Sequence, residues 1–164
     1  MLFRSPIPSL EIETRARWKI PNEMRQELLA VVLRASLDIW SKARPDARLR
    51  SLTGTYNCIG MVVANRRTWV DPEHLLRILR DDGFRRLASE AEATTGDVVV
   101  YRSDDGEVCH AGVVLRKNLY DPEASRDTLV VLSKWGAEGE YEHDASDVPL
   151  LCGRPAEYWT DRKG

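Results

Sequence analysis

Two apolar runs joined by an Asp-Gly turn constrain the fold of this chain more than any other feature. Residues 97–102 and 108–116 are each rich in valine and other apolar residues. The residues between them, Ser103 to Gly106, end in an Asp-Gly pair, which favours tight hairpin geometry. The sequence therefore predicts an antiparallel β-hairpin in the second half of the chain.

The first half of the chain has helical periodicity instead. Asn22 is a suitable cap for a helix running to about Arg44, where Pro45 follows. Apolar residues recur in this stretch at three- and four-residue steps, and the pattern predicts a buried face that includes Leu28, Val32 and Ile39.

Two shorter helices are expected after a loop over residues 45–57. One should begin at Cys58. The other has a clear start at residues 71–73, where an Asp cap, a proline and an acid follow one another, and it should end at residues 82–83.

Further strand patterns follow the hairpin. We expect a polar loop over 117–127, a third strand over 128–133 beside the 108–116 strand, and weaker strands at 141–143 and 148–151. Helices followed by strands predict an α+β fold with an antiparallel sheet. A length of 164 residues predicts a single domain.

Composition narrows the classes of function. A net charge of −2 argues against binding to nucleic acid or to an anionic membrane, and no apolar run is long enough to span a bilayer. The N-terminus has no pattern of a secretory signal. Three cysteines at no metal-like spacing predict neither a disulfide framework nor a metal site, so we expect a cytoplasmic protein without a metal or cofactor.

Cys58 and His110 are the strongest candidates for catalytic residues in this sequence. Cys58 stands where a loop runs into a helix, and His110 opens an apolar strand. A helix N-terminus offers free N–H groups and positive potential, which favour a thiolate. We therefore expect a pKa for Cys58 below that of a free thiol and fast alkylation of this residue. An imidazole within about 4 Å could take the thiol proton and return it to a leaving group.

Four segments resemble the papain-like cysteine hydrolases, especially their compact bacterial NlpC-type and CHAP-type branches. Residues 56–60 are similar to the nucleophile helix start, and 95–101 to the Pro-Gly-Asp strand entry of those families. Residues 109–115 are similar to their histidine strand, and Ser133-Lys-Trp-Gly136 stands where papain relatives have a polar residue followed by Trp-Gly. The resemblance covers about residues 54–143. It implies one papain-like domain, with an N-terminal extension and helix over 1–50, a catalytic core over 51–164, and the helices packed on a small antiparallel sheet.

The resemblance also implies roles. Cys58 attacks a carbonyl, His110 transfers the proton and Ser133 holds the imidazole, with His143 as the alternative third residue. Apart from the resemblance, we expect Lys134, beside Ser133, on the surface, with an ion pair to acids or a contact with a substrate carboxylate as the alternatives.

The N–H group of Cys58, helped by Tyr56 or Asn57, would stabilise the oxyanion. Asn57 stands where the relatives have an acid, and Ile59 where they have a serine.

These residues together predict a thiol-dependent hydrolase that cleaves an amide or isopeptide bond in a peptide or protein. Two alternatives stay open. One is a catalytically silent papain-like module that binds a peptide or partner protein. The other is an acyltransferase or deamidase that uses the same Cys-His pair. The substrate and the oligomeric state are not indicated.

Overall fold

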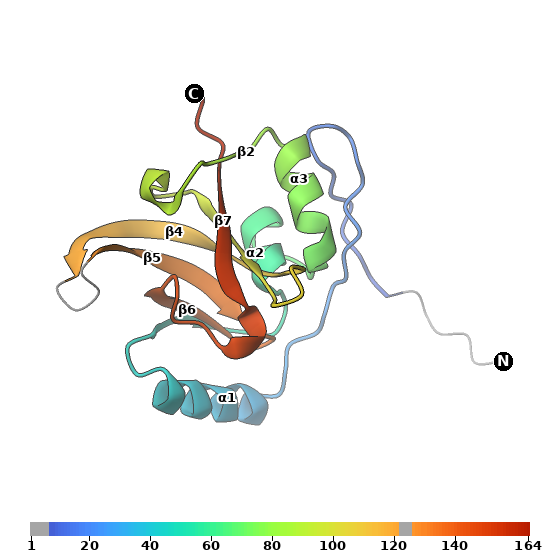
Figure 1. Ribbon diagram of the computed structural model, residues 1–164. Coiled ribbons are helices and arrows are strands. Elements are labelled where there is room, and N and C mark those ends of the chain that lie inside the picture. Colours follow the sequence, from blue (N-terminus) through green and yellow to red (C-terminus); the bar gives the residue numbers. More distant parts are fainter. Residues whose placement is uncertain (1–6, 122–125) are drawn as a thin grey trace.

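The computed structural model describes residues 7–121 and 126–164, and within them the chain is an α+β domain with an antiparallel sheet (Figure 1). The helices are α1 (Ala30–Ala43), α2 (Cys58–Val63) and α3 (Leu75–Asp81), with short 3-10 turns η1 (Pro72–His74), η2 (Glu90–Glu92) and η3 (Leu150–Cys152). The strands are β1 (Arg48–Leu52), β2 (Arg85–Arg86), β3 (Val98–Arg102), β4 (Val108–Asp121), β5 (Arg126–Trp135), β6 (Gly139–Asp144) and β7 (Arg154–Thr160).

The strands form one sheet in the order β1-β6-β5-β4-β3-β7-β2, and every pairing is antiparallel. The predicted hairpin is confirmed: β3 and β4 pair directly, and Gly106 closes the turn with a φ of 83°. The strand containing Ser133 lies beside the His110 strand as expected, with Ser133 opposite Gly112.

Several strand predictions are wrong. Residues 48–52, expected in a loop, form edge strand β1, and residues 148–151, expected as a strand, lead into the η3 turn. The loop expected over 117–127 is shorter, because β4 and β5 extend into it; residues 122–125 lie outside the described part of the chain.

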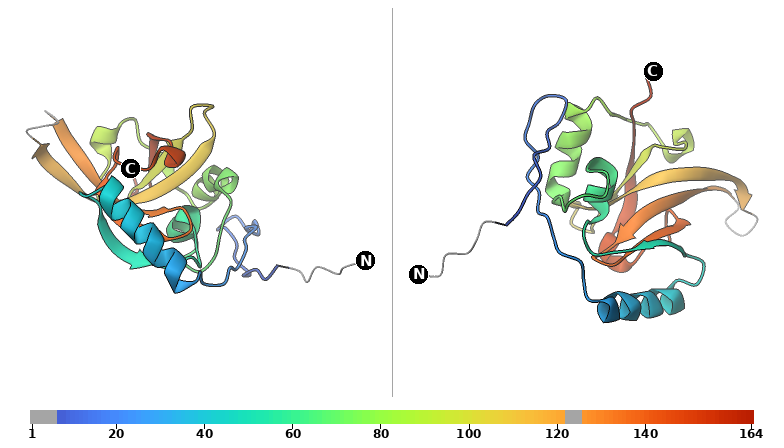
Figure 2. Two further views of the ribbon diagram at one scale, coloured as in Figure 1. Left: turned by 90° about the horizontal axis from the view of Figure 1, so that it is seen from below. Right: turned by 180° about the vertical axis from the view of Figure 1, so that it is seen from behind.

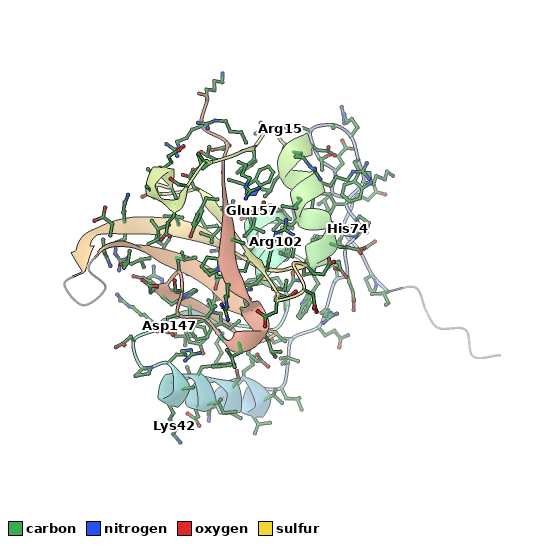
Figure 3. The ribbon with its side chains drawn as sticks, in the orientation of Figure 1. Arg15, Lys42, His74, Arg102, Asp147 and Glu157 are labelled. Carbon is green, nitrogen blue, oxygen red and sulfur yellow. The ribbon has the colours of Figure 1, made fainter. Side chains whose placement is uncertain are left out.

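Strand β7 is absent from the sequence-based prediction although it lies inside the sheet, between β3 and β2. It is held there partly by charge. Arg102 on β3 donates to Glu157 on β7 at 2.9 Å through its Nε atom, and Figure 3 shows the two side chains close together.

The sheet has an apolar core on each face. Alternate residues of β3 separate the cores: Val99 and Tyr101 belong to one, and Val98 and Val100 to the other. Trp40 of α1 packs against the first core, while α2 and α3 supply much of the second. Figures 1 and 2 show α1 on its own and α2 beside α3 elsewhere on the sheet.

Helix α1 corrects the first helix prediction. It begins at Ala30, because Asn22 does not cap it: the Asn22 side chain bonds to Leu10 and to the Thr68 hydroxyl, which holds an extended segment.

The buried face of α1 was also assigned wrongly. Leu33 is buried, whereas Val32 and Ile39 are 43% and 61% exposed and Leu28 is half-buried. Residues 33, 36, 37 and 40 form a second stripe at helical spacing, and this is the stripe that faces the protein.

Candidate active site

Cys58 is the first residue of α2, as predicted, and the chain fixes it firmly there. The Asn57 side chain caps the helix by accepting from the N–H of Gly60 at 2.9 Å. The same side chain accepts from the Val70 N–H at 3.2 Å and donates to the Val70 carbonyl at 2.7 Å. A β-carbon at Gly60 would lie 1.8 Å from the Thr68 carbonyl oxygen, so only glycine permits this close approach. Asn57 therefore holds the N-terminus of α2 in place from a buried position.

The Cys58 thiol is buried, with only 7% of the residue exposed. Burial raises the pKa of Cys58 to about 11, although hydrogen bonding from the backbone of Ala111, Ile59 and Cys58 itself acts in the opposite direction. The expectation of a lowered pKa is therefore wrong, because the loss of water outweighs the helix N-terminus. Cys58 is a neutral thiol at rest.

His110 lies on β4 opposite Tyr101, and the edge of its ring contacts the Tyr101 ring at 5.0 Å between centroids. The residue is 2% exposed, and its Nε2 atom is buried without a hydrogen-bond partner among the described residues. Burial, and then the nearby His143, lowers the pKa of His110 to about 3. His110 is thus a neutral imidazole.

Cys58 and His110 line the same cavity, which has a volume of about 570 Å³. The backbone contact between Cys58 and Ala111, the residue after His110, brings the two elements together at this point. The His110 ring itself packs on Tyr101 of the first core, whereas Cys58 belongs to the second. Trp69 also lines the cavity, and the Arg25 guanidinium covers its ring at 3.6 Å. Leu151, 95% exposed, stands on the rim.

All three cysteines of the chain line this cavity, each from a different element. Cys109 and Cys152 come from β4 and η3, and the Cys109 thiol donates to the Cys152 carbonyl at 3.1 Å. All three thiols are free. In the described residues, no group of three or more His, Cys, Asp or Glu side chains is arranged to hold a metal ion.

Ser133 lies on the same sheet face as His110, but its hydroxyl contacts another histidine. Its Oγ is 2.7 Å from Nε2 of His143, and Nδ1 of His143 is 2.7 Å from the Asp144 carbonyl. A carbonyl only accepts, so Nδ1 carries the proton, and Ser133 donates to Nε2 in the neutral ring. The structure joins the two candidates for the third position to each other, and neither bonds to His110 in the described part of the chain.

The position of Lys134 differs from the expected one. It is fully buried, not on the surface. Its ammonium group lies 5.0 Å from the centre of the Tyr56 ring. The Tyr56 hydroxyl donates to Glu140 at 2.6 Å, and Glu140 also binds Arg66 through both oxygens at 2.9 Å. A strand-end lysine followed by Trp-Gly gives no sign in the sequence of such burial.

The comparisons with known proteins place the chain in a family. The model of a domain of unknown function, DUF7689, matches residues 49–158, so the chain belongs to that family. The matched range contains the cysteine helix, the histidine strand and both candidates for the third position. No match was found among curated proteins or among solved structures. Within the described residues no helix is long and apolar enough to span a membrane.

Proposed function

We propose that this chain is a papain-like, thiol-dependent hydrolase that cleaves an amide or isopeptide bond in a peptide or protein. The observation that carries the proposal is the shared cavity: Cys58, at the N-terminus of α2, and His110, on β4, are both among the residues that line it. A cysteine and a histidine around one cavity are the minimum for nucleophilic acyl transfer.

The proposed reaction starts from two neutral groups. His110 takes the thiol proton as the sulfur bonds to the substrate carbonyl carbon, and it then gives that proton to the leaving amine as the C–N bond breaks. Water hydrolyses the resulting thioester and regenerates the thiol. Neutral groups suit a dry site, because no ion pair has to be held there before the substrate arrives.

The oxyanion formed by this attack would meet the backbone N–H of Cys58. The two side chains suggested as helpers are engaged elsewhere, Asn57 with Val70 and Tyr56 with Glu140. The stabilisation therefore rests on the backbone at the start of α2.

Peptidyl aminomethylcoumarin amides with varied side chains provide the test, together with mass spectrometry of a thiol-directed peptidyl vinyl sulfone. Both cleavage and labelling should be lost in Cys58→Ala, and cleavage should fall at least 100-fold in His110→Ala. Ile39→Ala, on the exposed face of α1, is the control. Cleavage that survives Cys58→Ala would exclude this mechanism. Transfer of the acyl group to an added amine would instead identify an acyltransferase, and release of ammonia from glutamine side chains a deamidase.

A silent binding module is the second candidate, and the pKa values favour it. Burial holds Cys58 protonated and His110 neutral, so the resting site lacks a thiolate. A module of this kind would bind peptides in the cavity equally well after Cys58→Ala, without any cleavage by the unmodified chain.

A further inference from the structure

Lys134 is a buried cation without a partner. The residue is 0% exposed, and its Nζ atom is buried with no hydrogen bond in the described part of the chain. Removing an ammonium group from water without pairing it is unfavourable, so such a group needs an explanation. The Tyr56 ring, 5.0 Å away, gives it a cation–π contact only.

The carboxylates around Lys134 have other partners. Glu140, directly opposite on β6, is bound by Tyr56 and by Arg66. Glu27 accepts from the Gly54 N–H at 2.6 Å. No ion pair joins Lys134 to a carboxylate in residues 7–121 and 126–164.

Glu138 also acts on Lys134, but no ion pair joins the two within the described residues. A further acid near Lys134 is the Cys58 thiol. Gly112 pairs with Ser133 across β4 and β5, so the next step of that ladder puts Ala111 opposite Lys134 on the same sheet face. The Ala111 backbone contacts the Cys58 sulfur, and Tyr56, which lies under the ammonium, is two residues before Cys58. Helix α2 and Lys134 therefore share one face of the sheet.

We propose that Lys134 is the counter-charge of this site: its ammonium group stabilises the negative charge that forms on the Cys58 sulfur when the thiol loses its proton. A role of Lys134 in turnover rests on the proposed function. The effect of Lys134 on the acidity of the Cys58 thiol does not. Lys134 acts through the sulfur and not on the substrate, which makes it a positioning residue.

The charged surroundings agree with this role. Burial lowers the pKa of Lys134 to about 8, while Glu138, Cys58, Glu140 and Glu27 act to raise it. Lys134 is thus mostly charged at neutral pH and loses its charge in mild alkali. His110, Cys109 and Cys152 line the same cavity as Cys58, and burial keeps each of them neutral.

The test measures alkylation of each cysteine of the full chain at pH 7 by iodoacetamide, followed by peptide mass spectrometry. In Lys134→Met the rate at Cys58 should fall about tenfold or more, because a nearby opposite charge moves a pKa by about one unit or more. Cys109 and Cys152 should react at unchanged rates, and Lys134→Arg should restore the rate at Cys58. Lys134→Met should also resist urea better than the parent chain, since it removes an unpaired buried charge.

Three results would overturn the proposal: an unchanged rate at Cys58, equal slowing at all three cysteines, or no reaction of Cys58 in the parent chain. Should Lys134→Met not fold, Lys134→Arg decides. Arginine keeps its charge in alkali, so the rate at Cys58 relative to the parent chain should rise between pH 7 and pH 9.5. A constant ratio contradicts the role.

Failure of this inference and failure of the proposed function are distinguishable. Slower alkylation in Lys134→Met, without any peptide cleavage by the parent chain, would support the counter-charge role and exclude the hydrolase. Cleavage that depends on Cys58 but is unaffected by Lys134→Met would support the hydrolase and exclude the counter-charge role.

Discussion

The hydroxyl of Ser133 lies 2.7 Å from Nε2 of His143, and both residues are buried, Ser133 on the strand beside the one that carries His110. This bond ties β5 to β6 and fixes the His143 tautomer through the Asp144 carbonyl. The serine oxygen keeps lone pairs that could accept a proton from a second histidine. His110 lies on the same sheet face, and its Nε2 has no partner within residues 7–121 and 126–164, so it is the group that would use one.

Ser133→Ala should weaken the fold more than loss of an exposed hydroxyl would. It leaves Nε2 of His143 buried and unpaired, which costs about 1–3 kcal/mol in the free energy of unfolding. Urea titration of Ser133→Ala, His143→Phe and the double variant measures the coupling between the two residues. The double variant should lose less free energy of unfolding than the two single variants lose together. Strictly additive losses would show that the bond is not formed in solution.

The same variants assign the third position of the proposed site. A neutral hydroxyl holds an imidazole weakly, so Ser133→Ala should lower cleavage by about 1–2 kcal/mol of barrier. Unchanged cleavage in Ser133→Ala, with complete loss in His143→Ala, would transfer the role to His143.

His110 predicts a loss of stability in acid. Its pKa is about 3 in the folded chain and about 6.5 when unfolded, so below pH 6.5 the unfolded chain binds the extra proton. The free energy of unfolding should therefore fall from pH 6.5 toward pH 3, by up to about 4 kcal/mol from this residue. Chemical denaturation of the parent chain and of His110→Asn at each pH isolates the contribution as their difference. Parallel pH curves would mean that His110 is hydrated in solution.

Asn57 predicts different effects for two substitutions. Asn57→Asp keeps the oxygens that accept from Gly60 and Val70 but loses the donor to the buried Val70 carbonyl, at a cost of about 1 kcal/mol or more. Asn57→Ala loses the cap as well, at a cost of about 2–4 kcal/mol. Thermal unfolding compares the two. Equal stability of Asn57→Asp and the parent chain would show that the Val70 carbonyl finds another donor.

Local chemistry explains which parts of this fold could be predicted from sequence. The hairpin turn at Gly106, the cap at Asp71 and the helix start at Cys58 depend on a few adjacent residues, and all three are present. The pairing of β4 with β5 follows from a short connection between them.

The features that could not be predicted from the sequence depend on contacts between residues far apart in the chain. β1 and β7 are strands because they pair with β6 and β3, and their own residues, with Arg48, Arg50 and Pro155 among them, lack a strong β pattern. The burial of Lys134 likewise comes from α2 packing over β5, which no local pattern indicates. The pKa of Cys58 was misjudged for the same reason, since desolvation depends on the whole fold.

The corrected face of α1 gives a matched pair of substitutions. Leu33 is buried against the domain, so Leu33→Ala should cost about 2–4 kcal/mol in the free energy of unfolding. Ile39, on the same helix, is 61% exposed, and Ile39→Ala should stay within about 0.5 kcal/mol of the parent chain. Urea titration compares the two, and a larger loss at Ile39 would mean that another surface covers this face in solution.

The three cysteines should react in an order opposite to the one expected from the sequence. Cys109 is partly exposed, while Cys58 and Cys152 are each 7% exposed, so iodoacetamide should modify Cys109 first. Burial raises the pKa of Cys58 to about 11 and that of Cys152 to about 12. The rate at Cys58 should therefore keep rising through pH 10, where an ordinary thiol with a pKa of about 8.5 has already levelled off. Mass spectrometry of the modified peptides between pH 6 and pH 10 measures all three residues in one series. A plateau near pH 8.5 at Cys58 would mean that water reaches this sulfur in solution and that the N-terminus of α2, no longer opposed by burial, controls its acidity.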